Sequence, residues 1–166
     1  EVEVVPGITA ALAAAAAIQQ SLTLRGVSRS VAFITLARGT DTLASQEDQR
    51  QLIQHPQADT LVYYMGRKDA AKIAQQLIQQ SAKKGGSTHK GDTPVHILEA
   101  VSTSRERLWS STLEKLAAGH ADDWFDSKSP ALIMIGRALK TSESSSPEID
   151  NSLQDSQIFP NGRRSA

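Results

Sequence analysis

The stretch "DTLVYYMG", residues 59–66, is the clearest strand in the sequence and is the basis for assigning the fold. Its β-branched and aromatic side chains favour extended backbone, and a glycine closes the run. Residues 69–82 follow with apolar side chains at helical spacing, among them Ile73, Leu77 and Ile78. A strand that leads directly into an amphipathic helix is typical of α/β proteins.

Three more segments have the apolar composition of buried strands: residues 30–37, 94–101 and 130–139. Residues 105–109 are predicted to pair with the second of these as a hairpin. Residues 1–5 alternate Glu and Val, so we expect a further strand there, ended by Pro6 and Gly7.

Helices are predicted over residues 10–20, 42–55 and 113–118, the first with Thr9 as its N-cap. Residues 83–93 are predicted as a polar loop. Strands separated by helices predict an α/β fold over residues 24–140, a layered mixed sheet with flanking helices. Residues 141–166 are rich in Ser and acidic side chains, and we expect them to form a disordered tail.

Composition excludes several functions. Lys plus Arg equal Asp plus Glu, at 18 each, so no general attraction to nucleic acid or to a membrane surface is expected. The longest apolar run, residues 8–18, is too short to span a bilayer. Cysteine is absent, which excludes disulfides and thiolate chemistry and fits a cytoplasmic protein.

Known catalytic patterns do not explain the chain. The four histidines match no metal-binding spacing, so we expect no metal, and no G-x-S-x-G, P-loop or G-x-G-x-x-G is present. What remains are three junctions between strands and turns: residues 6–10, residues 64–66 and residues 129–131. Ligands of open α/β sheets bind at strand ends, so these junctions are candidate binding elements. The alternative is that they are ordinary turns.

Four segments resemble the tetrapyrrole methylase family in their order and spacing: "EVEVVPGITAA", "SVAFIT", "LVYYMG" and "SPALIMIGRAL". The resemblance spans residues 1–139 and is to the C-terminal half of the members that methylate uroporphyrinogen III. It implies that residues 1–23 are the end of a first domain with a crossover helix, and that residues 24–140 are the second domain. The chain is therefore expected to be a fragment of a longer protein, a homodimer in its full form.

The resemblance also implies S-adenosylmethionine as methyl donor. Carried over by position, the expected cofactor contacts are Thr9, Ala10, Met65, Val101, Pro130 and Ala131. Methyl groups are expected to pass to ring carbons of uroporphyrinogen III, giving precorrin-2 for siroheme and cobalamin synthesis. Because this substrate carries many carboxylates, guanidinium contacts are expected from Arg25, Arg29 and Arg38. A solvated basic face is the alternative for these arginines, and core packing is the alternative for Met65.

Departures from the family pattern leave other functions open. Val101 stands where the family has a cofactor-contacting glycine, and the stretch of residues 17–25 lacks the family's Pro and His. One alternative is a related methylase that acts on a later corrin precursor. Another is a non-catalytic α/β module that binds a partner or dimerises. The sequence indicates no catalytic residue.

Overall fold

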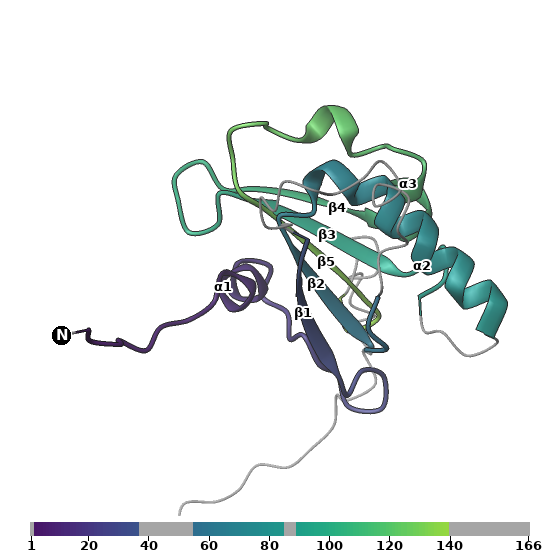
Figure 1. Cartoon of the computed structure of the whole chain (residues 1–166), viewed down its shortest axis with the longest axis horizontal. Coiled ribbons are helices and arrows are strands. Elements are labelled where there is room, and N and C mark those ends of the chain that lie inside the picture. Colours follow the sequence, from purple (N-terminus) through teal and green to yellow (C-terminus); the bar gives the residue numbers. More distant parts are fainter. Residues whose placement is uncertain (1, 37–54, 85–88, 140–166) are drawn as a thin grey trace, which may run out of the picture.

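The computed structural model describes residues 2–36, 55–84 and 89–139, which form a five-stranded sheet of order β1-β2-β5-β3-β4 (Figure 1). The strands are β1 (Val31–Thr35), β2 (Thr60–Tyr64), β3 (Pro94–Glu99), β4 (Arg107–Thr112) and β5 (Ala131–Gly136). The pair β1–β2 is parallel, and the other three pairs are antiparallel. The sheet is therefore mixed, as predicted.

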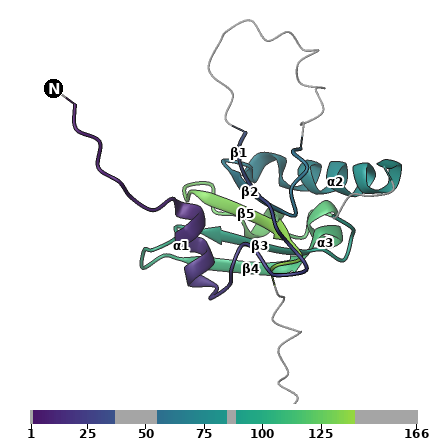
Figure 2. The ribbon, with the colours of Figure 1, turned by 90° about the horizontal axis from the view of Figure 1, so that it is seen from below.

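Helices cover both faces of the sheet (Figures 1 and 2). The long helix α2 (Ala70–Lys84) and the short helix α3 (Leu113–Ala117) pack on one face, and α1 (Ala10–Ala17) packs on the other. Two 3₁₀ turns, η2 (Arg67–Asp69) and η3 (Asp122–Trp124), lie in the connections. No helix within the described ranges is long and apolar enough to cross a bilayer.

The larger core lies beneath α2 and α3. Tyr63, Ile133 and Ile97 are aligned across three neighbouring strands and are completely buried. Ile73 and Leu77 of α2 pack against this row, which explains their helical spacing in the sequence. Burying aromatic and branched aliphatic side chains in this way is the main source of the domain's stability.

The second core is thinner because α1 consists almost entirely of alanine. Ala11 and Ala14 are fully buried against the opposite face of the sheet, where Val62 and Met134 lie side by side. Methyl side chains allow a helix backbone to lie close to a sheet, but each buries little apolar area. The position of α1 therefore depends on more than apolar packing.

Within the described residues, the strands predicted over residues 30–37, 59–66, 94–101 and 130–139 are confirmed, as are the hairpin and the helices at residues 69–82 and 113–118. The helix predicted over residues 10–20 is confirmed as far as Ala17, where it ends. The strand predicted at residues 1–5 is wrong. Residues 2–9 have no regular secondary structure, and Val2, Val4 and Val5 are largely exposed. No described strand pairs with this segment, and a strand forms only where a partner satisfies its backbone groups.

Two further predictions need adjustment. Strand β1 is half-buried rather than buried, because it lies at the sheet edge and exposes Phe33. Helix α2 continues to Lys84, into the segment predicted as a loop. The helix predicted at residues 42–55 and the tail at residues 141–166 lie outside the described residues, except for His55, which is not helical.

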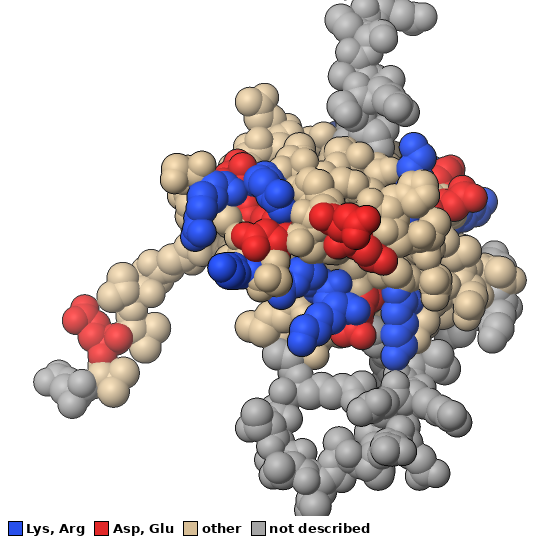
Figure 3. Space-filling model, turned by 90° about the horizontal axis from the view of Figure 1, so that it is seen from above, with Lys and Arg blue, Asp and Glu red and all other residues tan. Residues whose placement is uncertain are grey.

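The charged side chains are mixed over the face seen from above. Figure 3 shows Lys and Arg interspersed with Asp and Glu there, without a continuous field of one sign. The even charge balance of the sequence is thus repeated on this face, which offers no extended basic surface of the kind that binds a phosphate backbone.

Candidate functional site

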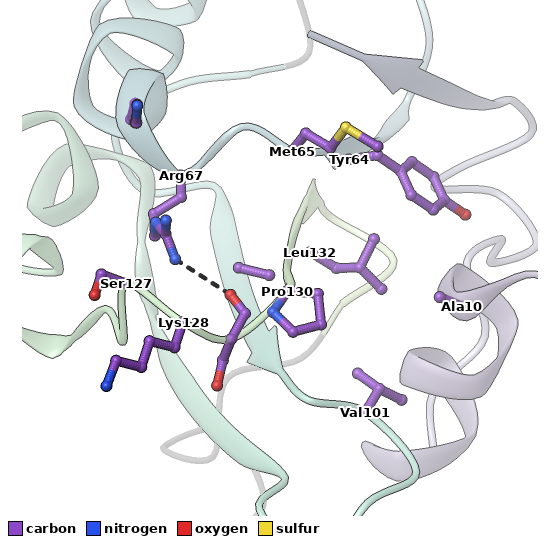
Figure 4. A pocket seen from close by; sticks show the side chains of 12 residues that line it. Ala10, Tyr64, Met65, Arg67, Val101, Ser127, Lys128, Pro130 and Leu132 are labelled. Carbon is purple, nitrogen blue, oxygen red and sulfur yellow. Dashed lines mark hydrogen bonds between the residues drawn. The ribbon is translucent and has the colours of Figure 1, made fainter. Parts of the chain in front are cut away.

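A pocket of about 530 Å³ opens where the inner strands of the sheet end (Figure 4). Because β5 is antiparallel to both of its neighbours, its first residues lie beside the last residues of β2 and β3. The N-terminus of α1 adds a further wall. The lining residues are Ala10, Tyr64, Met65, Arg67, Lys68, Val101, Ser127, Lys128, Ser129, Pro130, Ala131 and Leu132.

Five of the six expected cofactor contacts line this single pocket: Ala10, Met65, Val101, Pro130 and Ala131. They come from three junctions and one turn that are far apart in the sequence. Thr9 lies next to them but does not line the pocket. Its side chain is the N-cap of α1, accepting a hydrogen bond from the Ala11 amide at 3.5 Å, and it also bonds the Tyr64 hydroxyl.

Left-handed backbone marks both strand ends at the pocket. Met65, directly after β2, has a φ of 55°, and Ala100, directly after β3, has a φ of 49°. Residues with side chains rarely adopt this conformation, and strain of this kind is concentrated at functional sites. Met65 is also 70% exposed, so it is not a core residue.

The turn after β3 resolves the question raised by the valine in place of glycine. The left-handed positions are Ala100 and Ser102, on either side of Val101. Val101 is not left-handed itself, so a branched side chain fits there without strain, and this side chain lines the pocket. The Ala100 amide donates to the Pro130 carbonyl at 3.0 Å and ties this turn to the start of β5.

The opposite wall is the loop that enters β5, and Arg67 holds it. One guanidinium nitrogen of Arg67, Nη1, donates to the carbonyl oxygen of Asp126 at 2.5 Å. It also donates to the carbonyl oxygen of Ser129 at 3.2 Å (Figure 4). Asp126 in turn accepts from the Lys128 amide and the Ser129 hydroxyl, and these hydrogen bonds lower the pKa of its carboxyl group. The loop therefore has a fixed shape before any ligand binds.

A buried carboxylate supports the same loop from behind. Glu99, at the end of β3, is fully buried, and its Oε1 accepts from the Asp126 amide at 3.0 Å. Its Oε2 pairs with Arg107 at 2.5 Å. Arg107 also donates to the Trp124 carbonyl at 2.6 Å, and its guanidinium lies over the Trp124 ring.

The pocket has two chemically different sides (Figure 4). Tyr64, Leu132, Pro130 and Val101 form an apolar side, whereas the charged lining residues are all cations: Arg67, Lys68 and Lys128. Apolar walls with a few polar groups are typical of sites that bind small molecules. In the described part of the chain, no group of His, Cys, Asp or Glu side chains is arranged to hold a metal ion.

Two of the three expected substrate arginines lie outside the pocket lining. Arg25 and Arg29 do not line the pocket, and Arg38 lies outside the described residues. Arg29 precedes β1, at the opposite end of the sheet, where its amide donates to Asp59. Sequence reasoning missed five lining residues, which lie outside the predicted junctions: Arg67, Lys68, Ser127, Lys128 and Leu132. Each lies within two residues of the junction at residues 64–66 or the junction at residues 129–131, so extending these junctions by two residues would have included them.

Comparison with known proteins agrees with this architecture. The sequence profile for Tetrapyrrole (Corrin/Porphyrin) Methylases matches residues 1–117, and the chain belongs to this family. It is 37% identical over 147 residues to the uroporphyrinogen-III C-methyltransferase of Pseudomonas fluorescens, covering 88% of this chain and 53% of that protein. It is 34% identical over 143 residues to the siroheme synthase of Stutzerimonas stutzeri, covering 85% of this chain and 28% of that protein.

A solved structure shares the fold. It is the uroporphyrin-III C-methyl transferase of Thermus thermophilus complexed with S-adenosyl homocysteine, with 25% identity and a TM-score of 0.56. The superposition covers 82% of this chain and 52% of that one. The chain thus spans about half the length, or less, of these relatives.

Proposed function

We propose that this chain forms part of an S-adenosylmethionine-dependent C-methyltransferase that acts on uroporphyrinogen III, and that the pocket binds the methyl donor. One observation carries the proposal: residues from the three sequence junctions, expected to contact the cofactor, converge on one pocket. The similarity to a methyltransferase solved with S-adenosyl homocysteine supports the ligand class. Siroheme and cobalamin synthesis is the corresponding biological role.

The pocket residues suit this ligand. A bound S-adenosylmethionine supplies an electrophilic methyl group on a sulfonium. The exposed thioether of Met65 and the ring of Pro130 offer apolar contact for an adenine, and backbone groups at the strand ends offer it hydrogen bonds. The protein's contribution is then mainly to orient the donor and exclude water, since a displacement at a sulfonium needs little acid–base help.

Residues 1–23 belong, in this proposal, to the end of a first domain and a crossover helix, and residues 24–140 to the second domain. The methyl donor then lies between the two domains. Arg25, Arg29 and Arg38 remain candidates for the carboxylates of the substrate, which has to extend beyond the donor pocket. The full-length protein is proposed to be a cytoplasmic homodimer.

Ligand titration tests the pocket directly. We expect the full-length protein to bind S-adenosylhomocysteine in a calorimetric titration and to methylate uroporphyrinogen III. Ala131→Leu places a larger side chain in the pocket and should weaken binding at least about tenfold. The matched control is Ala118→Leu at an exposed position after α3, which should leave affinity unchanged.

Two outcomes would redirect the proposal. Equal binding by Ala131→Leu and wild type would mean that the donor binds elsewhere. Methylation of a later corrin precursor, with uroporphyrinogen III left unchanged, would favour the related methylase considered from the sequence. The 166-residue chain alone is expected to be inactive, because it spans about half of the methyltransferases it matches and the proposed cleft needs two domains.

A further inference from the structure

The side chain of Tyr64 joins the end of β2 to the first turn of α1. Its hydroxyl group forms a hydrogen bond with the Thr9 hydroxyl and accepts a second one from the Ala11 amide at 3.3 Å. In Figure 4 the ring extends toward the helix that carries Ala10, and the side chain of Met65 lies beside the base of the Tyr64 side chain. Two segments more than fifty residues apart in the chain are thus linked at the rim of the pocket.

Helix α1 needs such a link. It has eight residues, fewer than an isolated helix requires for stability in water. Its buried side chains are the methyl groups of Ala11, Ala14 and Ala15, which provide modest, non-directional contact with the sheet. The hydrogen bonds of Tyr64 are directional, and they act on the helix N-terminus, where amides lack partners within the helix.

The same link fixes one dimension of the pocket. Ala10 lies between the two residues that bond Tyr64, and it forms the wall on the α1 side. Met65 follows Tyr64 directly and forms the wall at the end of β2. Any shift of α1 along the sheet would therefore change the separation between these two walls.

We propose that Tyr64 is a positioning residue: its hydroxyl fastens residues 9–11 to the end of β2 and sets the width of the donor pocket. The inference rests on the proposed function for the identity of the ligand. It assigns the Thr9 side chain to holding the pocket wall rather than to touching the ligand.

Adjacent tyrosines provide a matched test in the full-length protein. Tyr64→Phe removes the linking hydroxyl and keeps the ring. Tyr63→Phe removes a hydroxyl that bonds His55 Nδ1 at 2.6 Å, on the opposite face of the sheet. We expect Tyr64→Phe to weaken S-adenosylhomocysteine binding about tenfold and to raise the KM for the methyl donor while kcat changes little. Tyr63→Phe should lower the melting temperature without changing affinity.

A double-mutant cycle separates fastening from direct contact with the ligand. Since Tyr64→Phe already removes both bonds of the hydroxyl group, adding Thr9→Val to it should cost no further affinity if Tyr64 acts by fastening residues 9–11. Thr9→Ser, which keeps a hydroxyl, should recover most of the affinity that Thr9→Val loses. Additive losses would show that the Tyr64 hydroxyl meets the ligand itself, and would overturn the inference.

Hydrogen exchange gives a readout that needs no ligand. Amides of α1 should exchange faster in Tyr64→Phe than in wild type, and at the wild-type rate in Tyr63→Phe. If wild type binds S-adenosylhomocysteine and Tyr64→Phe matches it in both affinity and exchange, the inference fails. If wild type does not bind while exchange still rises in Tyr64→Phe, the proposed function fails and the fastening stands.

Discussion

Glu99 and Arg107 form an ion pair in which only the arginine reaches solvent. The glutamate side chain is 0% exposed and the arginine side chain 46%, with 2.5 Å between the paired atoms. The second carboxylate oxygen accepts from the Asp126 amide, so the pair lies directly behind the loop that forms one wall of the pocket. Its role is to hold that wall.

Arg107→Met should therefore destabilise the domain, because it leaves a buried carboxylate without its cation. We expect the free energy of unfolding to fall by about 2 kcal/mol, less than for a fully buried pair since water can reach the site of Arg107. Urea denaturation measures the change. Arg105→Met, at an exposed position in the turn before β4, is the control. Equal stability of both variants would show that the pair contributes nothing.

Met65 permits a sharper test of the pocket, because its backbone is left-handed and its side chain exposed. Met65→Gly should leave the free energy of unfolding within about 1 kcal/mol of wild type, since relief of strain offsets the greater freedom of glycine in the unfolded chain. Affinity for S-adenosylhomocysteine should fall about tenfold with the loss of the thioether. Met65→Val should instead cost about 1–2 kcal/mol of stability, because a branched side chain resists this conformation.

The control for Met65 is Ile73→Val in the core beneath α2. It should lower stability by about 1 kcal/mol and leave ligand affinity unchanged. A Met65→Gly protein that binds the ligand as tightly as wild type would remove Met65 from the site.

Two glycines test the ends of the sheet separately. A Cβ at Gly136 would lie 2.8 Å from Thr60 Oγ1 and 2.9 Å from the Asp59 carbonyl oxygen, so Gly136→Ala should cost about 1–3 kcal/mol. A Cβ at Gly66 would meet the end of the Ile73 side chain at 3.3 Å, which can move, so Gly66→Ala should cost less. Thermal unfolding of the two variants measures both losses of stability. A larger loss in Gly66→Ala than in Gly136→Ala would contradict this packing.

The sequence was informative where local pattern and burial coincide. The helical spacing of Ile73 and Leu77 predicted the core face of α2. The turns around Met65 and Pro130 indicated the end of the sheet that carries the pocket. The failure at Val2 and Val4 has the opposite cause. Alternating side chains predict a strand only if a neighbouring strand is present, and no local pattern reports that neighbour.

Long-range polar contacts also could not be predicted from the sequence. Nothing in the residues around Tyr64 signals that its hydroxyl bonds Thr9, and nothing around Arg67 signals that it holds the Ser129 carbonyl. The left-handed backbone of Ala100 was hidden for a related reason, since alanine, unlike glycine, carries no signature of that conformation. These features depend on tertiary structure.

Two histidines, the buried His89 and the half-buried His55, should make the domain sensitive to acid. His55 bonds Tyr63 and Gln76, and His89 bonds the Ala58 carbonyl oxygen at 2.8 Å. Burial lowers the pKa of both rings below 6.5, so the folded state favours their neutral forms. The unfolded chain then binds more protons once the pH falls below about 6.5, and the free energy of unfolding should decrease from there toward the lower pKa values of the folded state.

Urea titrations at several pH values between about 8 and 5 measure this loss. His89→Gln should flatten the pH dependence in that interval, whereas His120→Gln, at an exposed position, should not. The carboxyl groups of Asp59 and Asp126 have a lowered pKa as well, but they bind protons only below about pH 4. Their titration therefore lies outside the interval in which the histidines titrate. A pH dependence that His89→Gln leaves intact would rule out His89 as its source.

Strand β5 lies at the centre of the sheet although it is the last described strand in the chain. During synthesis both strands of the β3–β4 hairpin leave the ribosome before β5 does. Strand β2 can pair with its antiparallel neighbour only after residues 131–136 have left the ribosome. Pro130 and Ala131 arrive at the same moment. Assembly of the binding site and closure of the sheet are thus one late event, and a nascent chain that stops before β5 has neither.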